Sequence, residues 1–241
     1  MTPAATRGIV FDLDDTLVWE RDYVRSGFRA VDAALVPLGL VPGAAFGRLW
    51  ADFEAGARGD QFNRLLAAFP DAAVSVADLV DVYRTHTPDL ALDAERRALL
   101  AALRPGHRLG VITDGPLASQ TAKAACIGLA ALVDAVVFSD AWGHAAWKPS
   151  PRPYPEAARA LGLAPAALTY VGDNPAKDFV TARALGWQTV RLRHPAQLRH
   201  AAEPPDDAHA ADHDVTSVRD LAALLGVPAP PDATPAGGPA L

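Results

Sequence analysis

The chain has 241 residues, of which 50% are hydrophobic, and its formal net charge is −6. Because acidic and basic residues are mixed along the chain, no basic stripe favours nucleic acid and no basic tract favours an anionic membrane. This length and composition allow a sizeable core, in one domain with an insertion or in two domains. We therefore expect a globular protein whose partners are small molecules.

Cysteine and lysine are both rare in this chain. Cys126 is the only cysteine, which excludes an internal disulfide. Since the first residues, MTPAATRGIV, also lack the features of a secretion signal, we expect a cytoplasmic protein.

Lys123, Lys148 and Lys177 are the only lysines. Where arginine has otherwise replaced lysine, a retained ammonium can mark a need for a compact charge, and Lys148 and Lys177 fall in motif-bearing segments.

The first predicted element is a buried strand that ends in carboxylates. Residues 7–18 read RGIVFDLDDTLV, and the apolar, β-branched run from Ile9 to Phe11 predicts a central strand. Asp12 and Asp14 follow this run. Ligands of open α/β sheets bind outside the carboxyl ends of the strands, so both carboxylates would emerge at the mouth of a site. A strand that simply ends in an Asx turn is the alternative interpretation.

The pattern is then helical from residue 19 to residue 94, with no intervening strand. Apolar residues at helical spacing predict four short amphipathic helices, with Gly39, Pro42, Pro70 and Pro88 as stop signals. Ser75 is the candidate N-cap of the fourth helix. Such helices form a small bundle, so we predict an inserted helical domain. Four aromatic residues lie at helical spacing and are expected to form its core: Trp50, Phe53, Phe62 and Phe69.

After a helix that begins near Asp93, the chain alternates between strands and helices. Short apolar runs predict strands at residues 109–113, 133–138, 168–171 and 188–192, and a last short strand and helix at 215–225. This alternation predicts a parallel sheet that helices cover on both faces. The expected fold class is α/β, with a Rossmann-like core at residues 1–18 and 95–227 and the helical domain at 19–94.

Two segments near the C-terminus predict little regular structure. Residues 193–212 are rich in His, Ala, Pro and Asp, and we expect a surface loop. His194, His200, His209 and His213 lie in or beside it, so a metal-binding tract is the alternative, although their spacing is irregular. Residues 228–241 are mostly Pro, Ala and Gly, which predicts a disordered tail.

Polar residues gather at the ends of the predicted strands. Parallel strands bring their carboxyl ends to one edge of a sheet, where uncompensated carboxylates would raise one another's pKa values. A bound divalent cation would relieve this repulsion, and oxygen ligands beside a substrate suit Mg²⁺. The residues concerned are Asp12, Asp14, Thr113, Asp114, Lys148, Asp173 and Asp178.

These residues carry a resemblance to a known family. The four segments resemble, in order, the four motifs of phosphatase-type haloacid dehalogenase (HAD) superfamily hydrolases, and the resemblance covers residues 8–192. The helical insertion after the first motif resembles the superfamily's helical cap of the first type. Four ordered motifs, each at a strand end, are far more specific than one Asp-rich pattern. They are Asp12-Leu13-Asp14-Asp15-Thr16, Thr113-Asp114-Gly115, Lys148-Pro149, and Gly172-Asp173 to Asp178.

The resemblance implies a phosphatase that works through a covalent intermediate. Asp12 would attack the phosphoryl group and form an aspartyl-phosphate. Asp14 would protonate the leaving alcohol and then deprotonate the attacking water. Thr113 would bind a phosphoryl oxygen through its hydroxyl, helped by backbone N–H groups near Asp114 and Gly115.

The resemblance also implies a lysine and a metal at the same site. Lys148 would neutralise the nucleophile and the phosphoryl oxygens, because positioned positive charge dominates catalysis of phosphoryl transfer. Asp12, the carbonyl of Asp14 and Asp173 would hold Mg²⁺. Asp178 would act on this metal through water or would orient Lys148.

Asp14 separates the phosphatase from a 2-haloacid dehalogenase of the same superfamily. Those dehalogenases lack the second Asp of the first motif and need no metal, because a halide leaves without protonation. The presence of Asp14 therefore favours phosphate transfer. A phosphomutase uses the same residues and remains an alternative, as does a non-catalytic binding protein on this scaffold, although such proteins usually lose a catalytic residue.

The implied cap would close over the site and contact the leaving group, so substrate choice is expected to reside in its helices. Tyr23 and Arg25, just after the first motif, are candidate specificity residues, as are Asn63 and Arg64 in the third helix. A cap of this size over the site suggests a small phosphate monoester, such as a sugar phosphate or a nucleoside monophosphate. The expected partner is therefore a small phosphorylated metabolite.

Overall fold

A computed structural model describes residues 7–231, and its centre is one sheet of six parallel strands. The strand order is β3-β2-β1-β4-β5-β6, which places the predicted central strand between β2 and β4. The predicted α/β fold class is confirmed. The strands are β1 (Arg7–Phe11), β2 (His107–Thr113), β3 (Ala135–Phe138), β4 (Leu168–Gly172), β5 (Gln188–Leu192) and β6 (His213–Val215).

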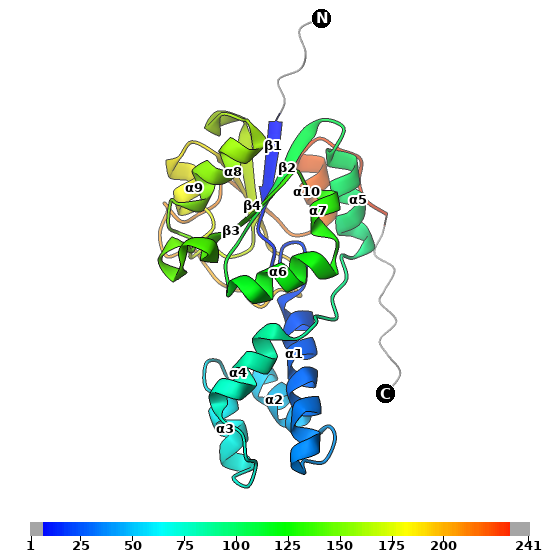
Figure 1. The fold of residues 1–241 in the computed structure, drawn as a ribbon. Coiled ribbons are helices and arrows are strands. Elements are labelled where there is room, and N and C mark those ends of the chain that lie inside the picture. Colours follow the sequence, from blue (N-terminus) through cyan, green and yellow to red (C-terminus); the bar gives the residue numbers. More distant parts are fainter. Residues whose placement is uncertain (1–6, 232–241) are drawn as a thin grey trace, which may run out of the picture.

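Helices cover both faces of this sheet, because successive side chains of a strand point to opposite faces. Ile9 and Phe11 pack in one core with residues of α5, α7 and α10, whereas Val10 packs in a second core with α8 and α9. Figure 1 shows these two groups of helices on opposite sides of the strands. The helices are α5 (Ala94–Leu103), α6 (Leu117–Cys126), α7 (Leu129–Leu132), α8 (Pro153–Leu161), α9 (Val180–Ala184) and α10 (Val218–Leu224).

Four further helices form a separate body, which we call the helical insert (residues 20–85). It lies beyond the carboxyl end of β1, at the edge of the sheet where the predicted motif residues gather (Figure 1). Its interior is apolar, with Phe28, Leu49, Leu65 and Leu79 buried together. The helices are α1 (Glu20–Leu35), α2 (Ala44–Glu54), α3 (Gln61–Ala68) and α4 (Val76–Thr85), and a 3-10 turn, η1 (Val36–Leu38), follows α1.

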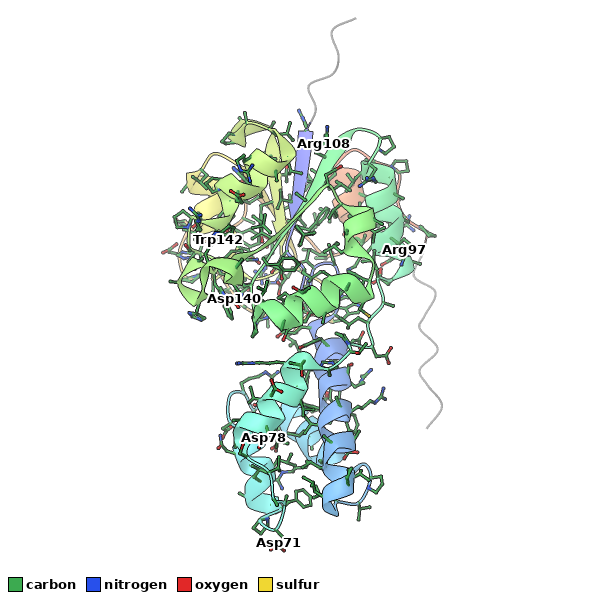
Figure 2. The ribbon with its side chains drawn as sticks, in the orientation of Figure 1. Asp71, Asp78, Arg97, Arg108, Asp140 and Trp142 are labelled. Carbon is green, nitrogen blue, oxygen red and sulfur yellow. The ribbon has the colours of Figure 1, made fainter. Side chains whose placement is uncertain are left out.

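Local features of the helical insert agree with the sequence analysis. Ser75 caps α4 in a capping box, in which Ser75 and Asp78 exchange side-chain to backbone hydrogen bonds. Of the four aromatic residues expected in its core, Phe53 is buried there, and Trp50, Phe62 and Phe69 pack against this core while partly buried. Figure 2 shows Asp71 and Asp78 on the insert and Arg108 at the opposite end of the molecule. The domain boundaries at residues 18, 94 and 227 stay predictions.

Residues 193–212 form turns without a helix or strand, and part of this loop is tied to the first motif. The Gln197 side chain donates to the carbonyl of Asp15 at 2.6 Å, and the Leu198 N–H donates to the Asp15 carboxylate at 2.9 Å. Within residues 7–231, none of the histidines of this segment belongs to a group that could hold a metal. The predicted tail at 228–241 lies outside the described residues from position 232 onward.

The connection after β3 is irregular but ordered by Asp140, which Figure 2 shows beside Trp142. Asp140 accepts hydrogen bonds from the N–H of Leu117 and from the Trp147 indole, both at 2.9 Å. It therefore fixes the start of α6 relative to the segment that carries Lys148. The 3-10 turns of the core are η2 (Ser139–Trp142), η3 (His144–Ala146) and η4 (Pro165–Ala167). In the described range, no helix has the length and apolar character needed to cross a membrane.

Candidate active site

The carboxyl ends of β1, β2 and β4 open into a cavity of 480 Å³ that the helical insert also lines. Parallel strands make this edge a natural site, because their last residues emerge side by side. From the core come Asp12, Asp14, Asp114, Gly115, Lys148 and Asp173, all of them predicted site residues. From the insert come Glu20, Tyr23, Tyr83 and Arg84.

Asp12 lies at the floor of this cavity between two ammonium groups. Its Oδ1 is 2.9 Å from Nζ of Lys148, and its Oδ2 is 3.7 Å from Nζ of Lys177. Burial alone would raise the pKa of Asp12, but the two lysines outweigh burial and lower it. Asp12 is therefore held as an anion, the form that a carboxylate nucleophile needs.

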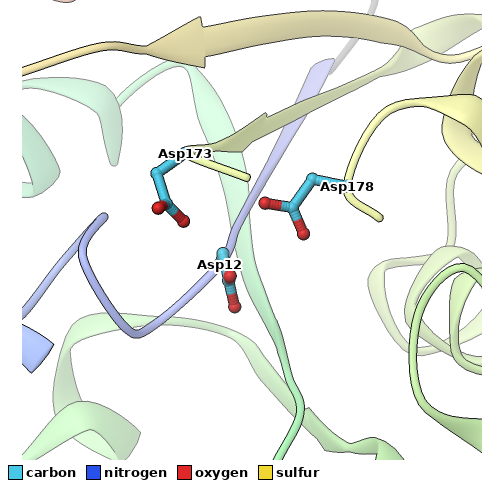
Figure 3. A group of neighbouring side chains, drawn as sticks. All are labelled: Asp12, Asp173 and Asp178. Carbon is cyan, nitrogen blue, oxygen red and sulfur yellow. The ribbon is translucent and has the colours of Figure 1, made fainter. Parts of the chain in front are cut away.

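Asp173 and Asp178 complete a buried acidic cluster with Asp12, and Figure 3 shows the three side chains near one another beyond the ends of their strands. One oxygen from each lies within 4.8 Å of the others. Burial, then Asp178 and Asp12, raises the pKa of Asp173 to about 9. Among the described residues, Oδ2 of Asp173 is buried without a hydrogen-bond partner. An unpaired oxygen in a cluster of hard ligands fits a divalent cation such as Mg²⁺.

The Asp14 carboxylate faces away from this cluster, toward α6. Both of its oxygens contact Nζ of Lys123, at 2.7 and 2.9 Å, and one also accepts from Gln120 Nε2 at 3.0 Å. The same ammonium lies 3.9 Å from the centre of the Tyr23 ring on α1. The prediction that Asp14 is a metal residue therefore rests on its backbone carbonyl alone, since its side chain is not in the acidic cluster.

Thr113 and Gly115, at the end of β2, lie against the same glutamine. The Thr113 hydroxyl donates to Gln120 Oε1 at 3.0 Å, so Gln120 joins the second motif to Asp14. Gly115 has a φ of +127°, and a Cβ at this position would come within 2.5 Å of Gln120 Nε2. Only glycine satisfies both conditions, which keeps the backbone here open to the cavity.

The Asp114 carboxylate points toward a lysine. Its Oδ1 accepts from the Ser139 hydroxyl at 2.7 Å and from the Lys148 N–H at 3.0 Å. Its Oδ2 accepts from Nζ of Lys177 at 2.9 Å. Three neighbours from other segments therefore fix this side chain, and the role of Asp114 in phosphate binding stays a prediction.

The candidate specificity residues separate into two groups. Tyr23 lines the cavity, whereas Arg25, Asn63 and Arg64 do not. The Arg25 guanidinium lies 4.9 Å from the centre of the Trp50 ring, and Asn63 lines a separate cavity of 200 Å³. These three residues lie outside the lining of this cavity, and their role in substrate choice stays a prediction.

Arg64 makes its contacts within the insert. Its guanidinium is 3.2 Å from an Asp60 oxygen and 3.6 Å from an Asp52 oxygen, so it serves contacts within the insert. Helical spacing places a residue on a face of its own helix, but it does not say which neighbour that face meets. The choice among polar residues of the insert therefore needed the tertiary structure.

Several cavity residues had no predicted role at the site, although Lys177 was noted as a retained lysine in a motif-bearing segment. They are Glu20, Gln120, Lys123, Lys177 and Arg199. The rarity of lysine was a usable signal, because all three lysines of the chain line this cavity. Arg199, from the loop at 193–212, pairs with Glu20 at 2.8 Å. The sequence around Arg199 and around Glu20 contains no motif that predicts a place in the site.

The chain is similar to known proteins over most of its length. The model of the haloacid dehalogenase-like hydrolase family matches residues 6–186. The chain is 28% identical to a glyceraldehyde 3-phosphate phosphatase of Methanopyrus kandleri, over 89% of this chain and 95% of that protein. It is 30% identical to a plasmid-encoded phosphoglycolate phosphatase of Cupriavidus necator, over 90% and 92% of the two chains. A HAD phosphatase structure from Thermococcus onnurineus has the same fold, with a TM-score of 0.58, 23% identity, and coverage of 92% and 98%.

Proposed function

This chain belongs to the haloacid dehalogenase-like hydrolase family, and from that premise we propose that it hydrolyses a small phosphate monoester through an aspartyl-phosphate on Asp12. It is a phosphoric monoester hydrolase, like the two phosphatases that match it over most of their length. The observation that carries the mechanism is the placement of Asp12, whose two oxygens face Lys148 and Lys177 at the floor of the cavity.

In the first half-reaction, an oxygen of Asp12 attacks phosphorus while the bond between phosphorus and the leaving oxygen breaks. Asp14 gives its proton to that leaving oxygen, and the alcohol departs. In the second half-reaction, Asp14 takes a proton from water, whose oxygen attacks phosphorus and releases inorganic phosphate from Asp12. Lys123 and Gln120 hold the Asp14 carboxylate at the cavity wall between the two steps.

Asp12, Asp173 and Asp178 would hold Mg²⁺ at the acidic cluster, with the Asp14 carbonyl as a further ligand. Bound there, Mg²⁺ would offset the negative charge of the phosphoryl oxygens. The unpaired buried oxygen of Asp173 supports this assignment, as does the raised pKa of its carboxyl. Lys148 contacts both Asp12 and Asp178 at 2.9 Å and so keeps two of these carboxylates in place.

The size of the site supports a small substrate. A cavity of 480 Å³ falls within the usual range of small-molecule pockets, roughly 300 to 1,000 Å³. The insert closes one side of it with Tyr23, Tyr83 and Arg84, which would meet the leaving group. The relatives named for glyceraldehyde 3-phosphate and phosphoglycolate are also phosphatases of small metabolites, which makes these two compounds the first to test.

The test of the proposed function is the release of p-nitrophenol from p-nitrophenyl phosphate by the purified protein. We expect activity with Mg²⁺, none with EDTA, and recovery when Mg²⁺ is restored. Asp12→Asn should abolish turnover in a folded protein and also controls for contaminating phosphatases. Near-normal rates in Asp12→Asn would exclude the covalent mechanism. Transfer of the phosphoryl group to a second hydroxyl, without release of inorganic phosphate, would identify a phosphomutase instead.

A further inference from the structure

The ammonium group of Lys148 is enclosed by protein oxygens. Asp12 Oδ1 and Asp178 Oδ1 are each 2.9 Å from Nζ, and the Tyr170 hydroxyl is 2.7 Å away. The Ile112 carbonyl lies at 3.5 Å on the same side. The Lys148 side chain has 0% exposure. An ammonium has three N–H donors, and the oxygens of Asp12, Asp178 and Tyr170, all within 2.9 Å, are enough to use them.

Lys177 occupies a different position beside the same nucleophile. Its side chain is 26% exposed and lines the cavity. Asp114 Oδ2 at 2.9 Å is its nearest anion, and Asp12 Oδ2 follows at 3.7 Å. Lys177 precedes Asp178 in the turn between β4 and α9. The Asp178 carboxylate contacts Lys148, whereas the side chain of its neighbour Lys177 lies at the cavity.

We propose that Lys177 is a catalytic residue that donates hydrogen bonds to the phosphoryl oxygens, and that Lys148 acts as a positioning residue for Asp12. This inference rests on the proposed function. Asp114 uses one N–H of Lys177, which leaves two donors beside Asp12 Oδ2, where the phosphoryl group must sit for attack. Positive charge at that place stabilises the charge that phosphoryl transfer spreads over the equatorial oxygens.

Asp114 orients Lys177. The Ser139 hydroxyl and the Lys148 N–H hold one oxygen of Asp114, so its other oxygen is directed at Lys177. A carboxylate this close to a phosphate would repel it unless a cation lay between them. Asp114 therefore acts through Lys177, as a positioning residue rather than as a phosphate ligand.

The test uses Lys177→Met and Lys177→Arg in the full chain with Mg²⁺. We expect Lys177→Met to lower kcat/KM for p-nitrophenyl phosphate by about 10²- to 10³-fold. Competitive inhibition by inorganic phosphate should weaken by about 10- to 100-fold, the loss expected for a hydrogen bond to a charged group. Lys177→Arg should retain part of the kcat/KM and part of the inhibition by inorganic phosphate that Lys177→Met loses. The control is Arg159→Gln, which removes one positive charge from an exposed position on α8 and should change neither.

Phosphate affinity decides the proposal, because a merely structural role would not change it. Unchanged inhibition by inorganic phosphate in a folded Lys177→Met protein would overturn the assignment. Asp114→Asn should also weaken phosphate inhibition, and the double variant Asp114→Asn with Lys177→Met should lose no more than Lys177→Met alone. Additive losses would mean that Asp114 does not act through Lys177.

If the wild-type protein does not hydrolyse p-nitrophenyl phosphate or the two named metabolites, the proposed function fails. Calorimetric binding of inorganic phosphate in the presence of Mg²⁺ then tests Lys177 directly. Binding that weakens in Lys177→Met supports the assignment, whereas equal binding, or no binding by the wild-type protein, overturns it.

Discussion

The carboxyl edge of the sheet and the helical insert bury opposite kinds of side chains. At the sheet edge, the ionisable side chains of Asp12, Lys148 and Asp178 are buried together. In the insert, the interior is aliphatic and aromatic, and ion pairs such as Arg21 with Glu54 lie at the surface. Burying charge costs free energy unless each charge is paired, so a chain keeps buried charges mainly where chemistry needs them. The buried residues of the sheet edge therefore fit a role in the reaction, whereas those of the insert stabilise its fold.

The two regions meet through a few contacts at the cavity. The Ser119 hydroxyl on α6 donates to the Arg84 carbonyl on α4 at 3.0 Å, and Lys123 contacts the Tyr23 ring on α1. Because Lys123 also holds Asp14, the insert reaches the proposed acid and base through one side chain. Substitutions at the sheet edge should therefore lower the rate of turnover, whereas substitutions inside the insert should lower the free energy of unfolding.

After the loss of turnover expected for Asp12→Asn, the largest effect is expected at Asp14. Asp14→Asn should lower turnover by about 10²- to 10⁴-fold, because an amide neither donates a proton to the leaving oxygen nor accepts one from water. Rapid-quench measurement of the first turnover isolates protonation of the leaving group. In that step the loss should be greater for an alkyl phosphate than for p-nitrophenyl phosphate, whose phenolate leaves without a proton. Equal first-turnover losses would contradict the role of Asp14 as the acid.

The matching change in the insert is at Leu49, which is fully buried in its core. Leu49→Ala should lower the free energy of unfolding by about 2–5 kcal/mol, because it leaves a cavity that the surrounding helices fill only in part. Urea unfolding measures this loss. The kcat of the folded enzyme for p-nitrophenyl phosphate should stay close to that of the wild-type protein. A large fall in kcat at low temperature would show that the interior of the insert also controls the site.

Removal of the metal should make the free energy of unfolding depend on pH through Asp173 at the sheet edge. The pKa of Asp173 lies at about 9 in the folded chain, above its usual value in an unfolded chain. The folded state therefore binds a proton that the unfolded state has lost, so the free energy of unfolding falls as pH rises between about 4 and 9. In EDTA this fall should be up to about 1.4 kcal/mol per pH unit.

Asp173→Asn supplies the control, because its amide does not titrate. In EDTA, the Tm of this variant should fall less steeply with pH than the Tm of the wild-type protein. Mg²⁺ should raise the wild-type Tm at pH 8 and raise that of Asp173→Asn much less. Parallel pH slopes for the two proteins would remove Asp173 as the cause.

The smallest effects are expected at two matched helix caps. Ser75 caps α4 in the insert, and Ser217 caps α10 in the core by accepting from the Asp220 N–H at 3.0 Å. Ser75→Ala and Ser217→Ala should each lower the free energy of unfolding by about 1 kcal/mol, measured with urea. Neither should change kcat. If Ser75→Ala alone lowered kcat, the start of α4 would have to affect the cavity through Tyr83 and Arg84.

Most of the fold and the acidic part of the site could be predicted from sequence, because both rest on local patterns. The apolar run before Asp12, the alternation of strands and helices, and the cap at Ser75 are each determined by a few adjacent residues. Strand β5 was predicted with its observed bounds, and most other elements within a few residues. Parallel strands then bring Asp12, Asp173 and Asp178 together as a consequence of topology.

Only the tertiary structure decided which charged groups pair. Lys123 meets Asp14 across 109 positions of sequence, and Arg199 meets Glu20 across 179. The sequence by itself determined where secondary structure forms and which carboxylates end the strands, since spacing and turn chemistry act locally. The orientation of each side chain toward a partner depends on how the helices pack, and packing involves residues from the whole chain. For that reason the separate positions of Lys148 and Lys177 became visible only in the folded molecule.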